Sequence, residues 1–299
     1  MKREDRFDSA DRIIKIGFWI NALLMILKLS AGYWGRSDAV LADGIESACD
    51  FIAIFATMMA LKLGRQPFDA EHPYGHGRAE NLAALLISFV ILATGGWILV
   101  DSAHTIIDRD FKSPGMVAVA AAFVTIIIKE WLHRLSVKTG RKLDSPALLA
   151  IAKDHRKDAV TSVATLVGVV GAFFGLGIMD PLAAGLTSFF ILHMGVGLLR
   201  EAAHDLMDGS APADFINDLQ QLVEGVPNVE QVHEIRARRS GQYTIVDLKL
   251  DMDPEMTVKE SHAIATEVKR LIFARYPGVG DVMIHINPHE EEHEDLIRL

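Results

Sequence analysis

Long apolar runs fill most of the chain up to Met207, and they constrain its fold more than any other feature. A helix needs about 20 mostly apolar residues to cross the hydrocarbon core of a membrane. The runs that meet or approach this length cover residues 13–34, 38–62, 81–107, 115–137, 147–176 and 180–206. The mean hydropathy is +0.24 although 23% of the residues are charged, because charge and apolar content are segregated along the chain. The sequence therefore predicts a membrane all-α fold, a six-transmembrane-helix bundle.

Basic residues in the short loops predict the orientation of these spans, since cytoplasmic loops carry an excess of Lys and Arg. The predicted cytoplasmic set is Lys2, Arg3, Arg6, Arg12, Lys15, Lys62, Arg65, Arg78, Arg134, Lys138, Arg141 and Lys142, against Arg36, Arg109 and Lys112 on the far side. An even number of spans then places both termini in the cytoplasm. The charged start, MKREDRFDSADR, shows no cleavable signal peptide, so we expect the first span to be retained. The net charge of −9 gives no indication of nucleic-acid binding.

A small soluble domain is predicted after the last span. The turn-forming run DGSAP at 208–212 separates a transmembrane domain, residues 1–208, from a cytoplasmic domain, residues 209–299. A helical pattern, two alternating runs joined by SGQ, an amphipathic helix at 257–276 and a strand at 281–287 follow in that order. This αββαβ order predicts a two-layer α/β domain. The single cysteine, Cys49, lies in a predicted span, so one chain offers no disulfide framework.

The second and fifth runs contain acidic residues, which are costly inside a bilayer and mark ion pathways there. Asp43, Glu46 and Asp50 lie on one helical face, and Asp154 and Asp158 lie one turn apart. Two helices that present carboxylates at this spacing can enclose one cation. The alternative is that the acids mark helix ends and reach water, which suits Asp43 and Asp154 but not Glu46 and Asp50. The pattern favours a cation site.

A second group of metal-ligating side chains lies in the loop FDAEHPYGHGRAEN at 68–81. Asp69, His72 and His76 can converge on a metal, and the two histidines offer imidazole nitrogens four residues apart. Two histidines beside Pro and Gly are also typical of ordinary loops. The spacing indicates a metal site without establishing one.

The predicted soluble domain carries a third group. His233, Asp247, His262 and His285 fall on both strands of the hairpin, on the second helix and on the last strand. Each of them taken singly is typical of a solvated surface. Their recurrence on several elements of one small domain predicts metal binding.

These features together make the chain resemble the cation diffusion facilitator family. The resemblance is carried by the loop HPYGHGRAE, by SPALLAIAKDHRKDAVTS and AAHDLMD, and by the αββαβ tail. It is nearest to the bacterial branch with the magnetosome iron transporters and the zinc/iron exporters. The resemblance implies a transport site at Glu46, Asp50, Asp154 and Asp158, a loop site at Asp69, His72 and His76, and tail metal positions at His233, Asp247, His262 and His285.

The same resemblance implies how the protein is assembled and where it resides. It implies a homodimer, formed through the tail and the membrane helices, in a bacterial inner membrane or an internal membrane derived from it. Arg78 and Asp208 correspond to a charge pair that links the membrane and tail regions in relatives.

The chain departs from the zinc-transporting members of the family at two places. Those members usually have a histidine among the four transport ligands, whereas all four are carboxylates here, which favours Mn²⁺ or Fe²⁺ without excluding Zn²⁺. Lys249 and Asn287 stand where zinc exporters tend to have ligands, which argues against a full binuclear cluster in the tail.

The resemblance and the acids predict a divalent metal cation efflux transporter, working as a metal/proton antiporter and not as an enzyme. The metal is substrate and regulator, and the proton is the counter-ion. The sequence has no Walker-type GxxxxGK[ST] motif, which disfavours ATP-driven pumping. A passive cation channel is one alternative, but it would not need a metal-binding tail. A membrane-embedded metallohydrolase built on His72 and His76 is another, and it leaves Glu46 and Asp50 unexplained.

Overall fold

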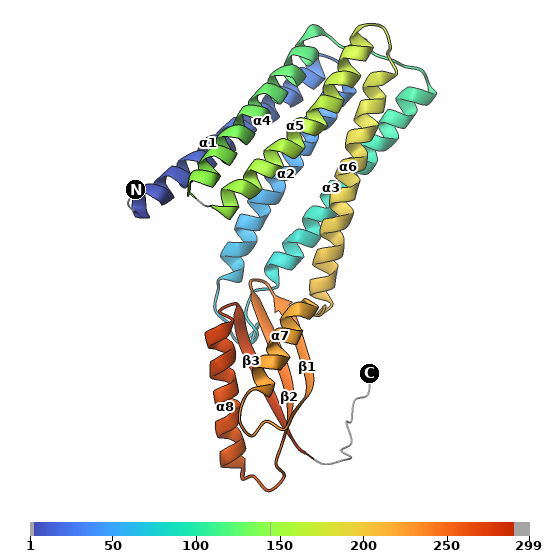
Figure 1. Cartoon of the computed structure of the whole chain (residues 1–299). Helices are drawn as coiled ribbons and strands as arrows, with labels where there is room; N and C mark the ends of the chain where they lie inside the picture. The colour runs from blue at the N-terminus through green and yellow to red at the C-terminus, as the bar shows by residue number, and fades with distance from the viewer. Residues whose placement is uncertain (1–2, 144, 290–299) are drawn as a thin grey trace. The chain divides into compact units, whose positions relative to one another are not determined.

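The computed structural model describes residues 3–143 and 145–289, with the side chains of 3–11 and 147 left out. All six apolar runs form helices (Figure 1). These are α1 (Arg3–Trp34), α2 (Asp38–Gly64), α3 (Ala79–Ile107), α4 (Met116–Leu143), α5 (Pro146–Phe173) and α6 (Met179–Leu206). Lys2, one of the predicted cytoplasmic basic residues, lies outside the described residues.

Within the described residues, five of these helices are long and apolar enough to cross a membrane, namely α1 from Arg12, α2, α3, α4 and α6. The chain is thus a multi-pass membrane protein. The predicted fifth span, α5, does not meet the same criterion, because Lys153, Asp154, Arg156, Lys157 and Asp158 crowd into its first half.

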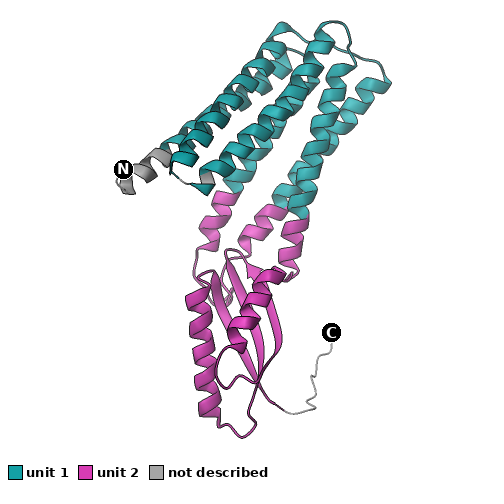
Figure 2. Ribbon diagram, in the orientation of Figure 1, with its two compact units in different colours: residues 1–56, 86–199 teal, residues 57–85, 200–299 magenta. Residues whose placement is uncertain are grey.

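The two units into which the chain divides by its contacts are residues 1–56 with 86–199, and residues 57–85 with 200–299 (Figure 2). The first unit is the apolar part of the helical bundle. The second joins the tail to the adjoining ends of α2, α3 and α6 and to the loop at 65–78. The domain boundary at 208 remains a prediction, because this division follows packing and cuts across three helices.

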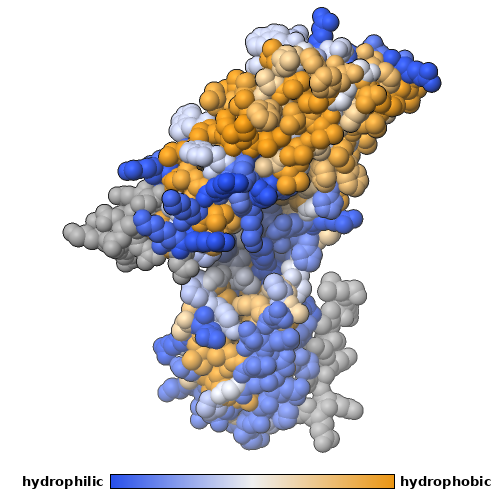
Figure 3. All heavy atoms as spheres, turned by 45° about the horizontal axis from the view of Figure 1, so that its top comes forward, coloured by the Kyte–Doolittle hydropathy of each residue, from blue (hydrophilic) through white to orange (hydrophobic). Residues whose placement is uncertain are grey.

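Small residues let the helices of the first unit pack closely. One core cluster joins α1, α2, α4 and α5 through Ala31, Val40, Ala118, Ala122 and Val169. A second joins α2, α3 and α6. The outward surface is apolar, with side chains such as Leu23, Leu86 and Phe189 at least 60% exposed. Figure 3 shows it as a broad orange area over the helices. An apolar exterior of this extent is what a helix bundle presents to lipid.

The tail is a two-layer α/β domain. Its elements are α7 (Ala213–Glu224), β1 (Gln231–Ser240), β2 (Tyr243–Met252), α8 (Val258–Arg275) and β3 (Val279–Pro288), in the predicted αββαβ order. The sheet order is β1-β2-β3, with β1 antiparallel and β3 parallel to β2. A parallel pair requires a crossover connection, and α8 supplies it.

One face of this sheet is covered by helices. Val246, Leu248 and Leu250 of β2 point into the same core as Leu219 of α7 and Ile272 of α8. Because side chains alternate along a strand, the residues between them, including Asp247 and Lys249, lie on the opposite, uncovered face.

Candidate metal-transport site

Three acids line one face of α2, as their spacing predicts, and their surroundings differ. Asp43 and Glu46 are buried, with exposures of 3% and 8%, and Asp50 is half-buried. Gly44 brings α1 close to this face, since a Cβ at Gly44 would lie 2.9 Å from the backbone nitrogen of Leu29. The acids therefore face the interior of the bundle and not the lipid.

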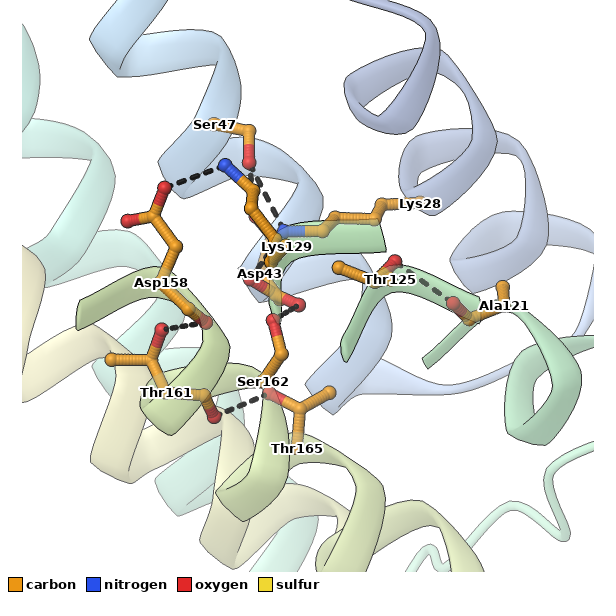
Figure 4. A network of polar contacts seen from close by, with 10 residues as sticks. All are labelled: Lys28, Asp43, Ser47, Ala121, Thr125, Lys129, Asp158, Thr161, Ser162 and Thr165. Atoms are coloured by element: carbon orange, nitrogen blue, oxygen red, sulfur yellow. Dashed lines mark hydrogen bonds and ion pairs between the residues drawn. The ribbon is translucent and has the colours of Figure 1, made fainter. Parts of the chain in front are cut away.

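Asp43 is held by an ion pair inside the bundle (Figure 4). Lys28 of α1 donates to Asp43 Oδ1 at 2.8 Å, and Ser162 of α5 donates to Oδ2 at 3.1 Å. Lys28 also donates to Ser47 at 3.2 Å. The interpretation of Asp43 as a helix end that reaches water is therefore wrong: the neighbouring helix supplies a buried counter-charge, which the sequence of α2 alone does not reveal.

Glu46 lies one turn further along α2, and no ion pair to it is found within the part of the chain that the structure describes. Its Oε2 atom is buried and accepts no hydrogen bond from any described residue. A buried polar group without a partner costs about 1–3 kcal/mol, and more when it is charged. A buried group of this kind in a native protein calls for an explanation, and a bound ion or water is one.

Asp50, Asp154 and Asp158 line one cavity of about 550 Å³ between α1, α2, α4 and α5. Asp154 and Asp158 lie on the first half of α5, which begins at Pro146 after the N-cap Ser145. The structure thus brings three of the four predicted transport ligands to one cavity, and Glu46 lies a turn away from Asp50. The described residues hold no cluster in which three of these acids lie within 4.8 Å of one another.

Asp158, the second of the two acids on α5, has a cationic neighbour. Lys129 of α4 donates to Asp158 Oδ2 at 2.6 Å (Figure 4), and Lys129 is only 5% exposed. Sequence reasoning missed Lys28 and Lys129, although each is a single basic residue inside an apolar run, in LLMILKLSA and VTIIIKEW. That signal was available, because isolated lysines inside a span are as costly as acids and are normally paired with them.

The loop residues Asp69, His72 and His76 do converge. They form the one group of three or more potential ligands found within 4.8 Å among the described residues. Asp69 Oδ1 lies 3.3 Å from His72 Nδ1, and Asp69 Oδ2 lies 3.5 Å from His76 Nε2. His76 Nδ1 faces the carbonyl oxygen of Pro67 at 3.2 Å, a contact that leaves Nε2 available as a ligand.

The Asp69 carboxylate is stabilised in its charged form. The backbone N–H of His72 donates to Oδ1 at 2.7 Å, and that of Glu71 donates at 3.0 Å. These bonds, with the His72 backbone contribution the largest, lower the pKa of Asp69. The Asp69 side chain is therefore an anion throughout the neutral range.

The tail residues do not converge within one chain. Asp247 and His285 lie on the uncovered sheet face, where their partners across the strands are Arg236 and Lys249. His262 lies on α8, which covers the other face of the sheet. His233 lies beside Asp251 instead, at 3.7 Å. No three of these four residues lie within 4.8 Å of one another among the described residues, so their role as metal ligands stays a prediction.

Arg78 and Asp208 form the expected ion pair. Asp208 also accepts from Arg238 of β1 at 3.1 Å, and Asn81 donates to Asp205 at 2.8 Å. These contacts join the start of α3, the end of α6 and the first tail strand within the second unit.

Comparison with known proteins decides the family. A sequence model described as the cation efflux transmembrane domain matches residues 14–207, and one described as the cation efflux protein cytoplasmic domain matches residues 211–289. The chain belongs to the cation diffusion facilitator family. This is a family of transporters, so membership speaks against the metallohydrolase alternative.

Relatives in this family are similar over nearly their whole length. Manganese efflux system protein MneP of Bacillus subtilis is 32% identical over 96% of this chain and 99% of the relative. Magnetosome protein MamB of Magnetospirillum gryphiswaldense is 28% identical over 96% and 97%. Metal tolerance protein C1 of Arabidopsis thaliana is 31% identical over 94% of this chain and 63% of the relative. The resemblance to the bacterial branch is confirmed.

Proposed function

We propose that this protein exports a divalent metal cation from the cytoplasm in exchange for protons, with Glu46, Asp50, Asp154 and Asp158 as the transport ligands. The observation that carries the proposal is the buried carboxylate oxygen Oε2 of Glu46, which has no hydrogen-bond partner among the described residues, one turn from a cavity lined by the other three acids. Carboxylate oxygens suit hard divalent cations. Two relatives named as manganese efflux system proteins support Mn²⁺ before Zn²⁺.

Proton exchange follows from the same acid set. Several carboxylates close together in a site of low dielectric constant cannot all remain charged and unpaired. They bind either a dication or protons, so release of one favours uptake of the other. No nucleotide is needed for this cycle.

The rest of the proposal concerns assembly. The six helices form the membrane domain with both termini in the cytoplasm. In this arrangement α5 is the charged helix of the bundle, on which Asp158 is half-buried and Asp154 is exposed. The tail forms a homodimer, in agreement with its match to the family's cytoplasmic domain. Asp69, His72 and His76 form a second cation site, for which the 4.8 Å cluster is the support.

Metal flux into proteoliposomes tests the transport proposal. We expect Mn²⁺ flux that rises with an imposed pH gradient, and at least a tenfold loss (about 1.4 kcal/mol) in Asp50→Asn. Asp101→Asn is the matched control, because Asp101 is an exposed acid of α3 outside the cavity. An Mn²⁺ flux that is the same with and without the pH gradient would indicate a passive channel. Normal flux in Asp50→Asn would remove Asp50 from the transport site.

A further inference from the structure

The ion pair between Lys129 and Asp158 occupies a ligand of the proposed transport site. We propose that the Lys129 ammonium is a tethered cation that holds Asp158 when no metal is bound and is displaced by the incoming metal ion. The inference rests on the proposed function, since it requires Asp158 to be a metal ligand. It adds a residue from α4 to a site otherwise built from α2 and α5.

The geometry makes the two cations mutually exclusive. Lys129 Nζ lies 2.6 Å from Asp158 Oδ2, and the two side chains are 6% and 30% exposed. Both line the same cavity of about 550 Å³ as Asp50 and Asp154. A dication bound to Asp158 would lie within a few ångströms of the ammonium, where repulsion is strong because little water screens it. The ammonium must therefore move away when the metal binds.

Lysine is suited to such movement. Its charge is a compact ammonium on a flexible four-carbon stem, and it does not form the two-pronged contact that an arginine makes with a carboxylate. The cavity next to Asp158 gives the ammonium room to withdraw. Asp158 in turn is only partly buried, so a metal can approach its other oxygen first.

Lys28, the second buried lysine of the bundle, serves as a comparison because its acidic partner lies outside the proposed transport site. Lys28 is 2% exposed and has two partners, Asp43 at 2.8 Å and Ser47 at 3.2 Å. Asp43 is further fixed by Ser162. Neither Lys28 nor Asp43 lines the cavity. Lys129 differs because its partner belongs to the transport set.

A tethered cation lowers metal affinity and assists metal release. When the metal leaves, Lys129 returns to Asp158 and stabilises a carboxylate that would otherwise be left unpaired. Removal of the ammonium should therefore tighten metal binding and slow turnover.

Equilibrium binding of Mn²⁺ to the purified full-length protein, at one fixed pH, tests this inference. All proteins carry His76→Ala, so that the loop residues do not contribute. We expect the Kd of Lys129→Met to fall by about tenfold, the order of effect expected when a competing charge is removed from a site of low dielectric constant. Lys129→Arg, which keeps the charge, should not tighten binding. Lys129→Gln should also tighten it, and it is the alternative neutral variant if Lys129→Met does not fold.

The matched control is Lys157→Met. Lys157 is exposed and lines the same cavity, one residue from Asp158. Lys157→Met therefore removes one positive charge near the site, as Lys129→Met does, without breaking the ion pair to Asp158. A Kd that falls equally in Lys157→Met and Lys129→Met would overturn the displacement mechanism.

A double-mutant comparison at Lys129 and Asp158 separates this inference from the proposed function. In an Asp158→Asn background, Lys129→Met should lower the Kd no more than Lys157→Met does, because only the general electrostatic effect of one lost charge remains. If Asp158→Asn weakens binding but neutral variants of Lys129 do not tighten it, the lysine inference fails and the transport site stands. If Asp158→Asn leaves the Kd unchanged, Asp158 is not a ligand, and both proposals fail at this residue.

Discussion

At the scale of single residues, Glu46 is the acid whose surroundings bear most directly on which metal the proposed site prefers. It is buried at 8% exposure and its Oε2 has no partner among the described residues, whereas Asp43 on the same helix face is paired with Lys28. A ligand site made only of carboxylates suits hard ions. Its metal preference should therefore change with the chemistry at position 46.

Glu46→His should shift the preference toward Zn²⁺, because imidazole is a softer donor than carboxylate and one negative charge is lost. We expect the ratio of Zn²⁺ to Mn²⁺ flux to rise by about tenfold, with Mn²⁺ flux reduced. Flux of both ions in proteoliposomes measures it, and Glu46→Gln controls for the loss of charge alone. An unchanged ratio in correctly inserted protein would reject Glu46 as a ligand.

At the scale of elements, the bundle is tied together by small residues and by one buried ion pair. Three helices meet at this pair, through Lys28 of α1, Asp43 of α2 and Ser162 of α5, and the pair is buried. Breaking a buried pair from one side leaves the other charge unpaired, which costs more than the pair itself contributes.

Asp43→Ala should accordingly lower the free energy of unfolding by about 3–5 kcal/mol, since it removes the carboxylate that neutralises the buried Lys28 ammonium and leaves it only the Ser47 hydroxyl. Thermal or denaturant unfolding of the detergent-solubilised protein measures the loss. The double variant Lys28→Met with Asp43→Leu should recover most of it, because neither charge remains. If Asp43→Ala unfolds like the unaltered protein, the ion pair does not stabilise the bundle.

At the scale of the whole molecule, the loop that carries Asp69, His72 and His76 packs against the tail within the second unit. Gly77 approaches the β1–β2 turn so closely that a Cβ there would lie 2.7 Å from the carbonyl oxygen of Ser240. Gly241, at the turn itself, has a φ of +60° and meets the backbone of Gly77. The loop cluster therefore depends on the tail for its position.

Gly77→Ala should weaken cation binding at the loop cluster, because the loop must move away from the turn to accommodate the methyl group. We expect the Kd for a divalent metal at this cluster to rise several-fold, to about tenfold. Calorimetry on the full-length protein in an Asp50→Asn background checks it. Gly278→Ala is the matched control, since a Cβ at Gly278 meets nothing within 4 Å. Equal affinity in both variants would show that the loop cluster forms without the turn.

The sequence by itself determined the helices, the αββαβ tail and the acid face of α2, because hydrophobic runs, strand alternation and helical periodicity are local properties. It also determined the convergence of Asp69, His72 and His76, which lie within eight residues of one another and are joined by short turns. Only the tertiary structure decided which buried acids have a lysine partner, since Lys28 and Lys129 reach Asp43 and Asp158 from other helices. Only the tertiary structure separated His262 from Asp247 and His285, because the two layers of the tail place them on different sides of the sheet. Pairing across helices and layers depends on how distant segments pack, and no local pattern encodes that.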